Sequence, residues 1–209
     1  MDLSYVLNKL KGHSPNILGH KELQKYAVLL PLLEINHETH ILFEVRSMNL
    51  RRQPGEICFP GGRIEQDDID QSQCAIRETS EELGISETDI ENVMPLDFML
   101  NASSNIIYPY VGTIKNPNNI TPNPMEVGEV FTVPLSYFLK TKPKVYKIHF
   151  KVIPEESFPL NLLVGGENYK WQIRHVDEYF YRYNDKVIWG LTAKILVHFL
   201  SIVEAEKNV

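Results

Sequence analysis

The stretch "GGRIEQDDIDQSQCAIRETSEELGI", residues 61–85, decides the fold because it joins a glycine-rich loop to a well-delimited helix. Asp70 is a good N-cap residue, since its short side chain can accept a hydrogen bond from the first helical turn. Gly84 is placed to end the helix, because glycine readily adopts the left-handed conformation common at helix C-termini. These two residues predict a helix over residues 71–83.

Glu78, Glu81 and Glu82 lie near the C-terminal end of this helix, three or four positions apart. At this spacing the carboxylates repel one another, and the helix dipole disfavours negative charge at this end. A cluster that breaks the local rules of stability indicates function. Mg²⁺ would relieve the repulsion, because it prefers carboxylate oxygens. The alternative from these residues alone is a solvated acidic helix face.

The segments on either side of residues 61–85 alternate between strand and helix patterns. Residues 25–36 and 39–47 are apolar runs joined by the turn "HETH", which is typical of a β-hairpin. The later elements are expected as two strands over 89–100 and 106–114 and a strand turning helical near Ser136 over 127–139. Strand-like alternation with a turn at Gly165-Gly166 follows over 144–188, and a final helix over 190–206. This order favours an α+β (mixed α/β) domain with a mixed β-sheet.

The length of 209 residues suits one domain, so residues 1–209 are expected to form a single unit. Residues 2–11 have the apolar spacing of a short amphipathic helix, which makes residues 1–20 an N-terminal helical extension. No apolar run is long enough to span a bilayer, and the N-terminus has no apolar segment of signal-peptide length. We therefore expect no membrane partner.

Charge and cysteine content narrow the function classes further. The net charge of −6 argues against a nucleic-acid binder, because such proteins usually carry a strongly basic surface. Two cysteines, Cys58 and Cys74, suggest neither a disulfide framework nor a zinc site. A reducing cytoplasm is the simplest compartment on these grounds.

Residues 61–85 resemble the Nudix box, G-x5-E-x7-R-E-U-x-E-E-x-G-U, in which U is a bulky apolar residue. The matching residues are Gly61, Gly62, Arg77, Glu78, Glu81, Glu82 and Gly84. The pattern departs from the box at Asp68, which replaces a glutamate and lies one residue further from Arg77 than usual. It also departs at Thr79, where an apolar residue is usual.

The resemblance implies a Nudix α/β/α sandwich and hydrolysis of a nucleoside diphosphate linked to another group. It implies Mg²⁺ or Mn²⁺ held by Glu78, Glu81 and Glu82, with a metal lowering the pKa of the attacking water. Arg77 would pair with a nearby carboxylate and hold it in position rather than bind substrate. Asp68 would order the loop.

Residues 42–62, "LFEVRSMNLRRQPGEICFPGG", resemble an additional motif of Nudix coenzyme A pyrophosphatases. The residues at matching positions are Arg46, Ser47, Arg51, Gly55, Phe59, Pro60, Gly61 and Gly62. The resemblance implies cleavage of coenzyme A, or an acyl or oxidised derivative, to 3′,5′-ADP and 4′-phosphopantetheine. Arg46 and Arg51 would bind substrate, because guanidinium groups donate paired hydrogen bonds to phosphate. Gly61 and Gly62 would complete this binding surface.

These arginines have a plainer interpretation, as surface residues or as bridges to Glu44 and Glu56.

A further acid from outside the box often serves Nudix enzymes as a base or a metal partner. Glu126 is the candidate and Glu129 the runner-up, although both could be ordinary loop acids. Glu81 or Glu82 could instead be the base, so the catalytic set predicted from the sequence is Glu81, Glu82 and Glu126.

Two other functions remain open at this point. A Nudix pyrophosphatase could act on another diphosphate, such as ADP-ribose, NADH, a nucleotide sugar or an oxidised dNTP. A Nudix-like domain could also bind a nucleotide without cleaving it and act as a regulator. A homodimer is an expectation from the family alone.

Overall fold

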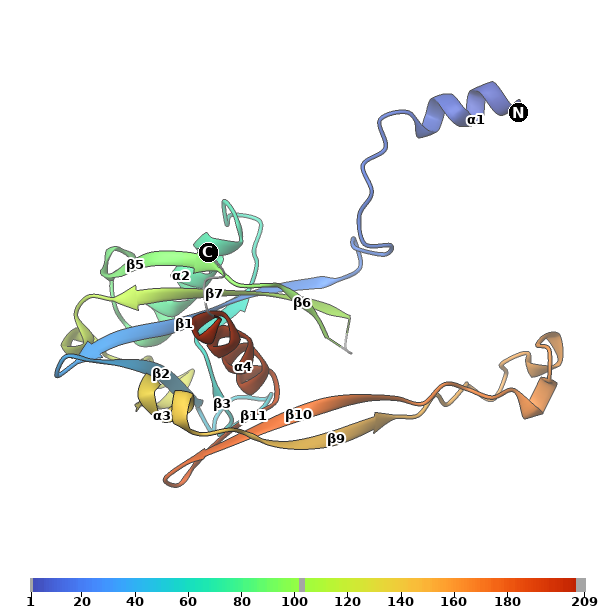
Figure 1. Cartoon of the computed structure of the whole chain (residues 1–209). Coiled ribbons are helices and arrows are strands. Elements are labelled where there is room, and N and C mark those ends of the chain that lie inside the picture. The colour runs from blue at the N-terminus through green and yellow to red at the C-terminus, as the bar shows by residue number, and fades with distance from the viewer. Residues whose placement is uncertain (1, 102–103, 206–209) are drawn as a thin grey trace.

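The computed structural model describes residues 2–101 and 104–205, and within them eight strands form one mixed sheet (Figure 1). The central strand β1 (Gln24–Ile35) pairs antiparallel with β2 (Glu38–Arg46) and parallel with β7 (Asn105–Ile114). The remaining strands all pair antiparallel: β3 (Ile57–Cys58) and β8 (Val127–Pro134) with β2, β4 (Gly61–Arg63) with β1, and β5 (Ile90–Pro95) and β6 (Met99–Leu100) with β7.

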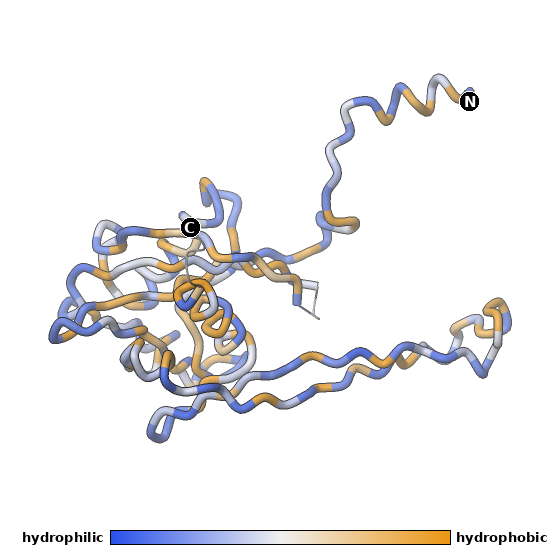
Figure 2. The backbone as a smooth tube through the Cα atoms, in the orientation of Figure 1, coloured by the Kyte–Doolittle hydropathy of each residue, from blue (hydrophilic) through white to orange (hydrophobic). Residues whose placement is uncertain are grey.

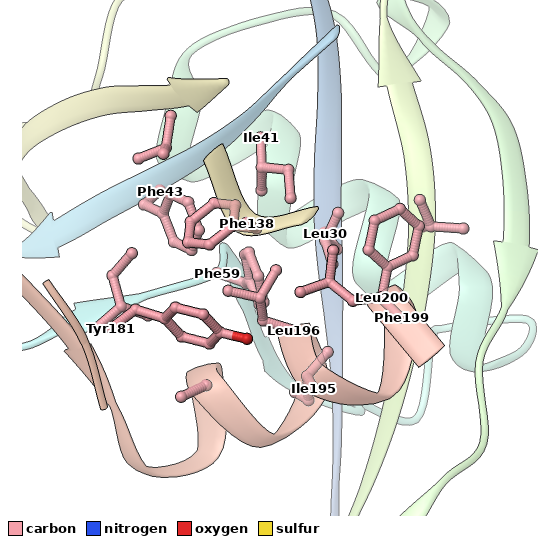
Figure 3. Packing of buried hydrophobic residues seen from close by; sticks show 14 of the residues in the cluster. Leu30, Ile41, Phe43, Phe59, Phe138, Tyr181, Ile195, Leu196, Phe199 and Leu200 are labelled. Carbon is pink, nitrogen blue, oxygen red and sulfur yellow. The ribbon is translucent and has the colours of Figure 1, made fainter. Parts of the chain in front are cut away.

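Helices cover both faces of this sheet, because its central strands are apolar on both sides. Successive side chains of a strand point to opposite faces. Leu29 of β1 therefore packs toward α2 (Gln71–Leu83), whereas Leu30 packs toward α3 (Leu135–Lys140) and α4 (Gly190–Glu204). Figure 3 shows side chains from the sheet, α3 and α4 meeting in the second of these cores. The expected α/β/α sandwich is confirmed.

Helix α2 has the bounds and the caps that its sequence predicts. The Asp70 side chain accepts a hydrogen bond of 2.9 Å from the backbone N–H of Gln73. Gly84 is left-handed, with φ of 62°, and its N–H donates to the carbonyl of Ser80. The helix ends beside the loop before β8, because the N–H groups of Thr121 and Asn123 donate to its last carbonyls.

Two expected strand regions differ in detail. Residues 89–100 form two strands, β5 and β6, because pairing with β7 ends at Pro95 and resumes only at Met99, with one more residue on this side than on β7. Over residues 144–188, the expected strands form a second sheet of β9 (Lys144–Phe150), β10 (Arg174–Tyr183) and β11 (Lys186–Trp189), and the long connection between β9 and β10 includes the expected turn at Gly165 and Gly166. Short 3₁₀ turns complete the chain: η1 (Glu87–Asp89), η2 (Pro117–Asn119), η3 (Leu160–Leu162) and η4 (Gly166–Asn168).

The β9–β10 ribbon extends away from the sandwich, and so does the N-terminal helix α1 (Leu3–Leu10) (Figure 1). Asp2 caps α1 by accepting a hydrogen bond of 2.8 Å from the N–H of Tyr5. Apolar and polar residues alternate along this helix (Figure 2), and all of its side chains are exposed. Among the described helices, none is long and apolar enough to cross a membrane.

Candidate active site

Strand β4 and helix α2 meet at Gly61 and Gly62. The backbone N–H of Gly61 donates a hydrogen bond of 2.8 Å to Oε2 of Glu82. A Cβ atom on Gly62 would lie 2.2 to 2.4 Å from the carboxylate atoms of Glu78, so only glycine leaves room for that carboxylate. The two glycines thus place the helix glutamates against the sheet backbone.

The three glutamates of α2 occupy different environments. Glu82 is buried, with 5% of its surface exposed, and points to the sheet. The Glu78 side chain is 17% exposed, whereas that of Glu81 is 57% exposed and reaches only the edge of Arg77, at 3.4 Å. Solvent exposure therefore increases across the cluster, from the buried Glu82 through Glu78 to the solvated Glu81.

Arg77 joins the helix to the loop that precedes it. Its Nε atom lies 2.9 Å from Oδ1 of Asp68, and its Nη1 atom lies 2.9 Å from Oε1 of Glu78. Asp68 also accepts a hydrogen bond of 2.8 Å from the N–H of Glu65. The hydrogen bond from Arg77 lowers the pKa of Asp68 to about 2, and Asp68 in turn raises the pKa of Arg77. Asp68 is thus engaged in ordering the loop, and Arg77 fixes the position of Glu78.

Glu44 is a buried acid at this site that the sequence analysis did not assign to it. It lies in β2 opposite Cys58 of β3, is 1% exposed, and accepts a hydrogen bond of 3.2 Å from the Cys58 thiol at Oε1. Within the described part of the chain, its Oε2 atom has no hydrogen-bond partner. The signal was available in the sequence, because Glu44 is a charged residue inside the apolar run of residues 41–45.

Burial and mutual repulsion shape the charge states of these acids. Burial raises the pKa of Glu82, and repulsion from Glu44 adds to the rise, while the hydrogen bond from Gly61 opposes it. Burial likewise raises the pKa of Glu44, against the hydrogen bond from Cys58. Burial also raises the pKa of Glu78, although the Arg77 guanidinium acts in the opposite direction. The positive charge of Arg46 also lowers the pKa of Glu44, although within the described residues no ion pair joins Glu44 or Glu82.

The loop before β8 brings Glu126 to the cluster. The N–H of Ser47 donates to the Glu126 carbonyl at 2.7 Å, and the Ser47 hydroxyl donates to the Pro124 carbonyl at 3.2 Å. Glu126 is exposed. Burial is the main cause of the raised pKa of Glu78 and Glu82, and the negative charge of Glu126 adds to it. Glu129 points elsewhere, because its carboxylate forms an ion pair of 2.6 Å with Lys186. The structure thus separates the two acids that the sequence left as alternatives.

The two arginines of the loop after β2 are positioned differently. The Arg46 backbone is held by hydrogen bonds with Glu56 and Gly55, and its Nε atom lies 3.4 Å from the carbonyl of Arg52. Arg51 is exposed on the loop. Across residues 2–101 and 104–205, neither arginine forms an ion pair, so neither is the carboxylate bridge considered above.

The donor atoms of this site fit a hard divalent cation. Its side chains offer carboxylate oxygens, the ligands that Mg²⁺ and similar ions prefer, and within the described residues Oε2 of the buried Glu44 has no hydrogen-bond partner. In the part of the chain that the structure describes, no three acidic, histidine or cysteine side chains are grouped so that they could hold a metal ion together. Arg77 contacts Glu78 through Oε1, so the guanidinium holds this carboxylate beside Gly62.

The chain belongs to the Nudix family, since residues 24–155 match the NUDIX domain. A similar protein is the peroxisomal coenzyme A diphosphatase NUDT7 of Mus musculus, 40% identical over 128 residues, which are 61% of this chain and 53% of that protein. Another is the mitochondrial coenzyme A diphosphatase NUDT8 of Homo sapiens, 30% identical over 153 residues, which are 72% of this chain and 64% of that protein. The chain thus spans between half and two thirds of the length of these relatives.

A solved structure supports the fold independently of the motifs. The crystal structure of a MutT/nudix family protein from Enterococcus faecalis superimposes with a TM-score of 0.53 at 14% sequence identity, covering 100% of this chain and 72% of that one. At this identity the likeness concerns the fold alone.

Proposed function

We propose that this protein is a Nudix pyrophosphohydrolase that cleaves coenzyme A, or an acyl or oxidised derivative, to 3′,5′-ADP and 4′-phosphopantetheine or its derivative. The observation that carries the proposal is the buried carboxylate of Glu82, which the Gly61 amide holds among further acids at the edge of the sheet. Carboxylates gathered in this way suit the binding of cations beside a polyanionic diphosphate.

Glu78, Glu81 and Glu82 would hold Mg²⁺ or Mn²⁺. Such an ion supplies charge neutralisation at the diphosphate and lowers the pKa of the attacking water. Glu126 lies at the exposed rim of the cluster and would accept the proton of that water, while Glu81 and Glu82 remain alternative bases. Water adds to one phosphorus, the P–O bond to the bridging oxygen breaks, and the leaving phosphate carries the bridging oxygen away.

The choice of coenzyme A as substrate rests on the loop after β2 and on the relatives. Arg46 and Arg51 would contact the phosphates of the adenosine moiety, including its 3′-phosphate, as charged donors suited to phosphate. Support comes from the two relatives above, both of which bear the name coenzyme A diphosphatase. ADP-ribose, NADH, nucleotide sugars and oxidised dNTPs are the alternative substrates, and nucleotide binding without cleavage is the alternative function.

Compartment and assembly also remain proposals. Cys58 and Cys74 are free thiols, which suits a reducing cytoplasm, whereas the relatives above are named as peroxisomal and mitochondrial proteins. Formation of a homodimer is tested by light scattering after size exclusion.

Product analysis by mass tests the function. The purified protein is incubated with coenzyme A, ADP-ribose, NADH and oxidised dGTP, each with Mg²⁺, with Mn²⁺ and with a chelator. We expect 3′,5′-ADP and phosphopantetheine from coenzyme A only when metal is present. Cleavage of another compound in preference would contradict the substrate, and metal binding without any cleavage would favour the regulator.

A further inference from the structure

The orientation of Glu44 follows from the strand that carries it. Alternate residues of β2 share one face of the sheet. Leu42 belongs to the core beneath α2, whereas Phe43 belongs to the opposite core. Glu44, two positions after Leu42, therefore faces α2, the side from which Glu82 approaches the sheet.

The immediate surroundings of Glu44 do not satisfy a buried carboxylate. Among the described residues, its Oε1 atom accepts a hydrogen bond from the Cys58 thiol alone, which is a weak donor, and Arg46 acts on it only at a distance beyond an ion pair. Its Oε2 atom is without a hydrogen-bond partner among the described residues. Glu82 brings a second buried carboxylate to the same region, and no ion pair in the described part of the chain joins either of them. Burying charged oxygens without such partners is costly, so native proteins pair them or use them to coordinate metals.

We propose that Glu44 is a further metal ligand of this site, with its Oε2 atom binding a divalent cation from the sheet side while Glu82 binds from the helix side. The cation site would then extend beyond the helix glutamates into β2. The inference rests on the proposed function for the nature of the ion. It adds a ligand from outside the glutamate motif of α2, in a strand whose other side chains at this depth are apolar.

The Cys58 thiol has a supporting part in this arrangement. It donates to Oε1 and leaves Oε2 free, so it orients the Glu44 carboxylate toward α2. Groups that orient a metal ligand without touching the metal typically change affinity less than the ligand does, although their removal is still measurable. Cys58 is therefore a positioning residue in this proposal.

The test measures Mn²⁺ binding to the protein without substrate, by titration calorimetry and by the electron paramagnetic resonance signal of free Mn²⁺. Glu44→Gln keeps the size of the side chain and removes its charge. We expect it to weaken Mn²⁺ binding by more than the roughly tenfold to hundredfold typical of groups that only orient a ligand, or to remove one bound ion. Glu38→Gln is the matched control, because Glu38 begins the same strand and is exposed. Wild-type binding of Mn²⁺ by Glu44→Gln would overturn the proposal.

Two further variants keep the outcome decisive. If Glu44→Gln does not fold, Glu44→Asp retains the charge but withdraws it by one methylene, and unchanged Mn²⁺ affinity in that variant would overturn the proposal. Cys58→Ala separates the metal role from a structural one. If Glu44 serves only as the acceptor for Cys58, then Cys58→Ala will match Glu44→Gln in its effect on Mn²⁺ binding, again against the proposal.

Glu82→Gln distinguishes this inference from the proposed function. Loss of Mn²⁺ binding in Glu82→Gln with normal binding in Glu44→Gln would leave the helix site in place and reject only the role of Glu44. Normal Mn²⁺ binding in both variants would reject the metal site of the proposed function as well.

Discussion

Gly61 and Glu82 are joined by a hydrogen bond of 2.8 Å from the backbone amide of a strand to the carboxylate of a helix. The bond fixes a buried acid at the point where the glycine loop enters the sheet. One stretch of chain can thus supply both the loop and the acids, because residues 71–83 pack directly against residues 61–63 and against β1. Geometry at these two glycines should therefore control the site.

The two glycines are expected to respond differently to alanine. A Cβ atom on Gly61 would lie 2.3 Å from the Ala27 carbonyl and 2.6 Å from Cα of Val28, and the φ of Gly61 is 151°. Gly61→Ala should thus destabilise the fold by about 2 to 4 kcal/mol in chemical unfolding. On Gly62 the three atoms nearest to a Cβ all belong to the end of the flexible Glu78 side chain, so Gly62→Ala should keep its stability and weaken Mn²⁺ binding. Equal loss of stability in both variants would contradict this distinction.

Arg77→Lys tests the role of the guanidinium. Lysine keeps the charge but cannot donate in parallel to Asp68 while also contacting Glu78. We expect a loss of roughly 2 kcal/mol in the free energy of unfolding, because a charged hydrogen bond in a part-buried setting is removed. We also expect reduced turnover with little change in KM, since Arg77 positions Glu78 and does not contact substrate. A raised KM with unchanged kcat would instead indicate that Arg77 binds substrate.

The stability of the metal-free protein should fall as the pH rises above the ordinary carboxyl pKa of 4.5, because burial raises the pKa of Glu44 and Glu82. Between 4.5 and the raised values, the folded protein binds more protons than the unfolded chain, so unfolding becomes easier with increasing pH. Asp68 has the opposite effect only in acid. Its pKa is lowered to about 2, so the stability that its ionised form contributes is constant from pH 5 upward. With a chelator present to remove metal, the melting temperature should decline less between pH 5 and pH 9 in Glu82→Gln than in the wild type. Parallel declines would show that other groups cause the effect.

Arg51 is expected to recognise the 3′-phosphate of coenzyme A, because it is exposed on the loop and free of ion pairs within the described residues. Arg51→Gln should lower kcat/KM for coenzyme A by roughly tenfold to a hundredfold, as expected for one charged hydrogen bond. Dephospho-coenzyme A, which lacks that phosphate, should be affected much less. Arg63→Gln is the matched control on the exposed end of β4. If kcat/KM fell equally for both substrates, Arg51 would contact a part of the substrate other than the 3′-phosphate.

Local signals made helix α2 predictable from the sequence. Asp70 and Gly84 act on their own immediate neighbours, so the bounds of the helix and the crowding of its glutamates could be deduced without tertiary information. The break between β5 and β6 could not, because it depends on the register of pairing with β7, which is set by residues 105–114 further along the chain.

The rest of the site depends on pairing between distant segments. Glu44 meets Cys58 only because β2 and β3 pair in one particular register. Glu126 and Glu129 are three residues apart, and their different surroundings follow from the hydrogen bond of the Glu126 carbonyl with Ser47 and the ion pair of Glu129 with Lys186. An apolar strand interrupted by one acid was nevertheless visible in residues 41–45, and such an interruption is a useful signal of a buried site.

The most direct test of the central claim compares coenzyme A hydrolysis by the wild type and by Glu82→Gln at saturating Mg²⁺. Glutamine preserves the size of the side chain and can still accept the hydrogen bond from Gly61, so the fold should survive, as circular dichroism will check. We predict that the wild type releases 3′,5′-ADP and that kcat/KM falls by at least about a hundredfold in the variant. A folded Glu82→Gln variant with kcat/KM close to that of the wild type would contradict the account.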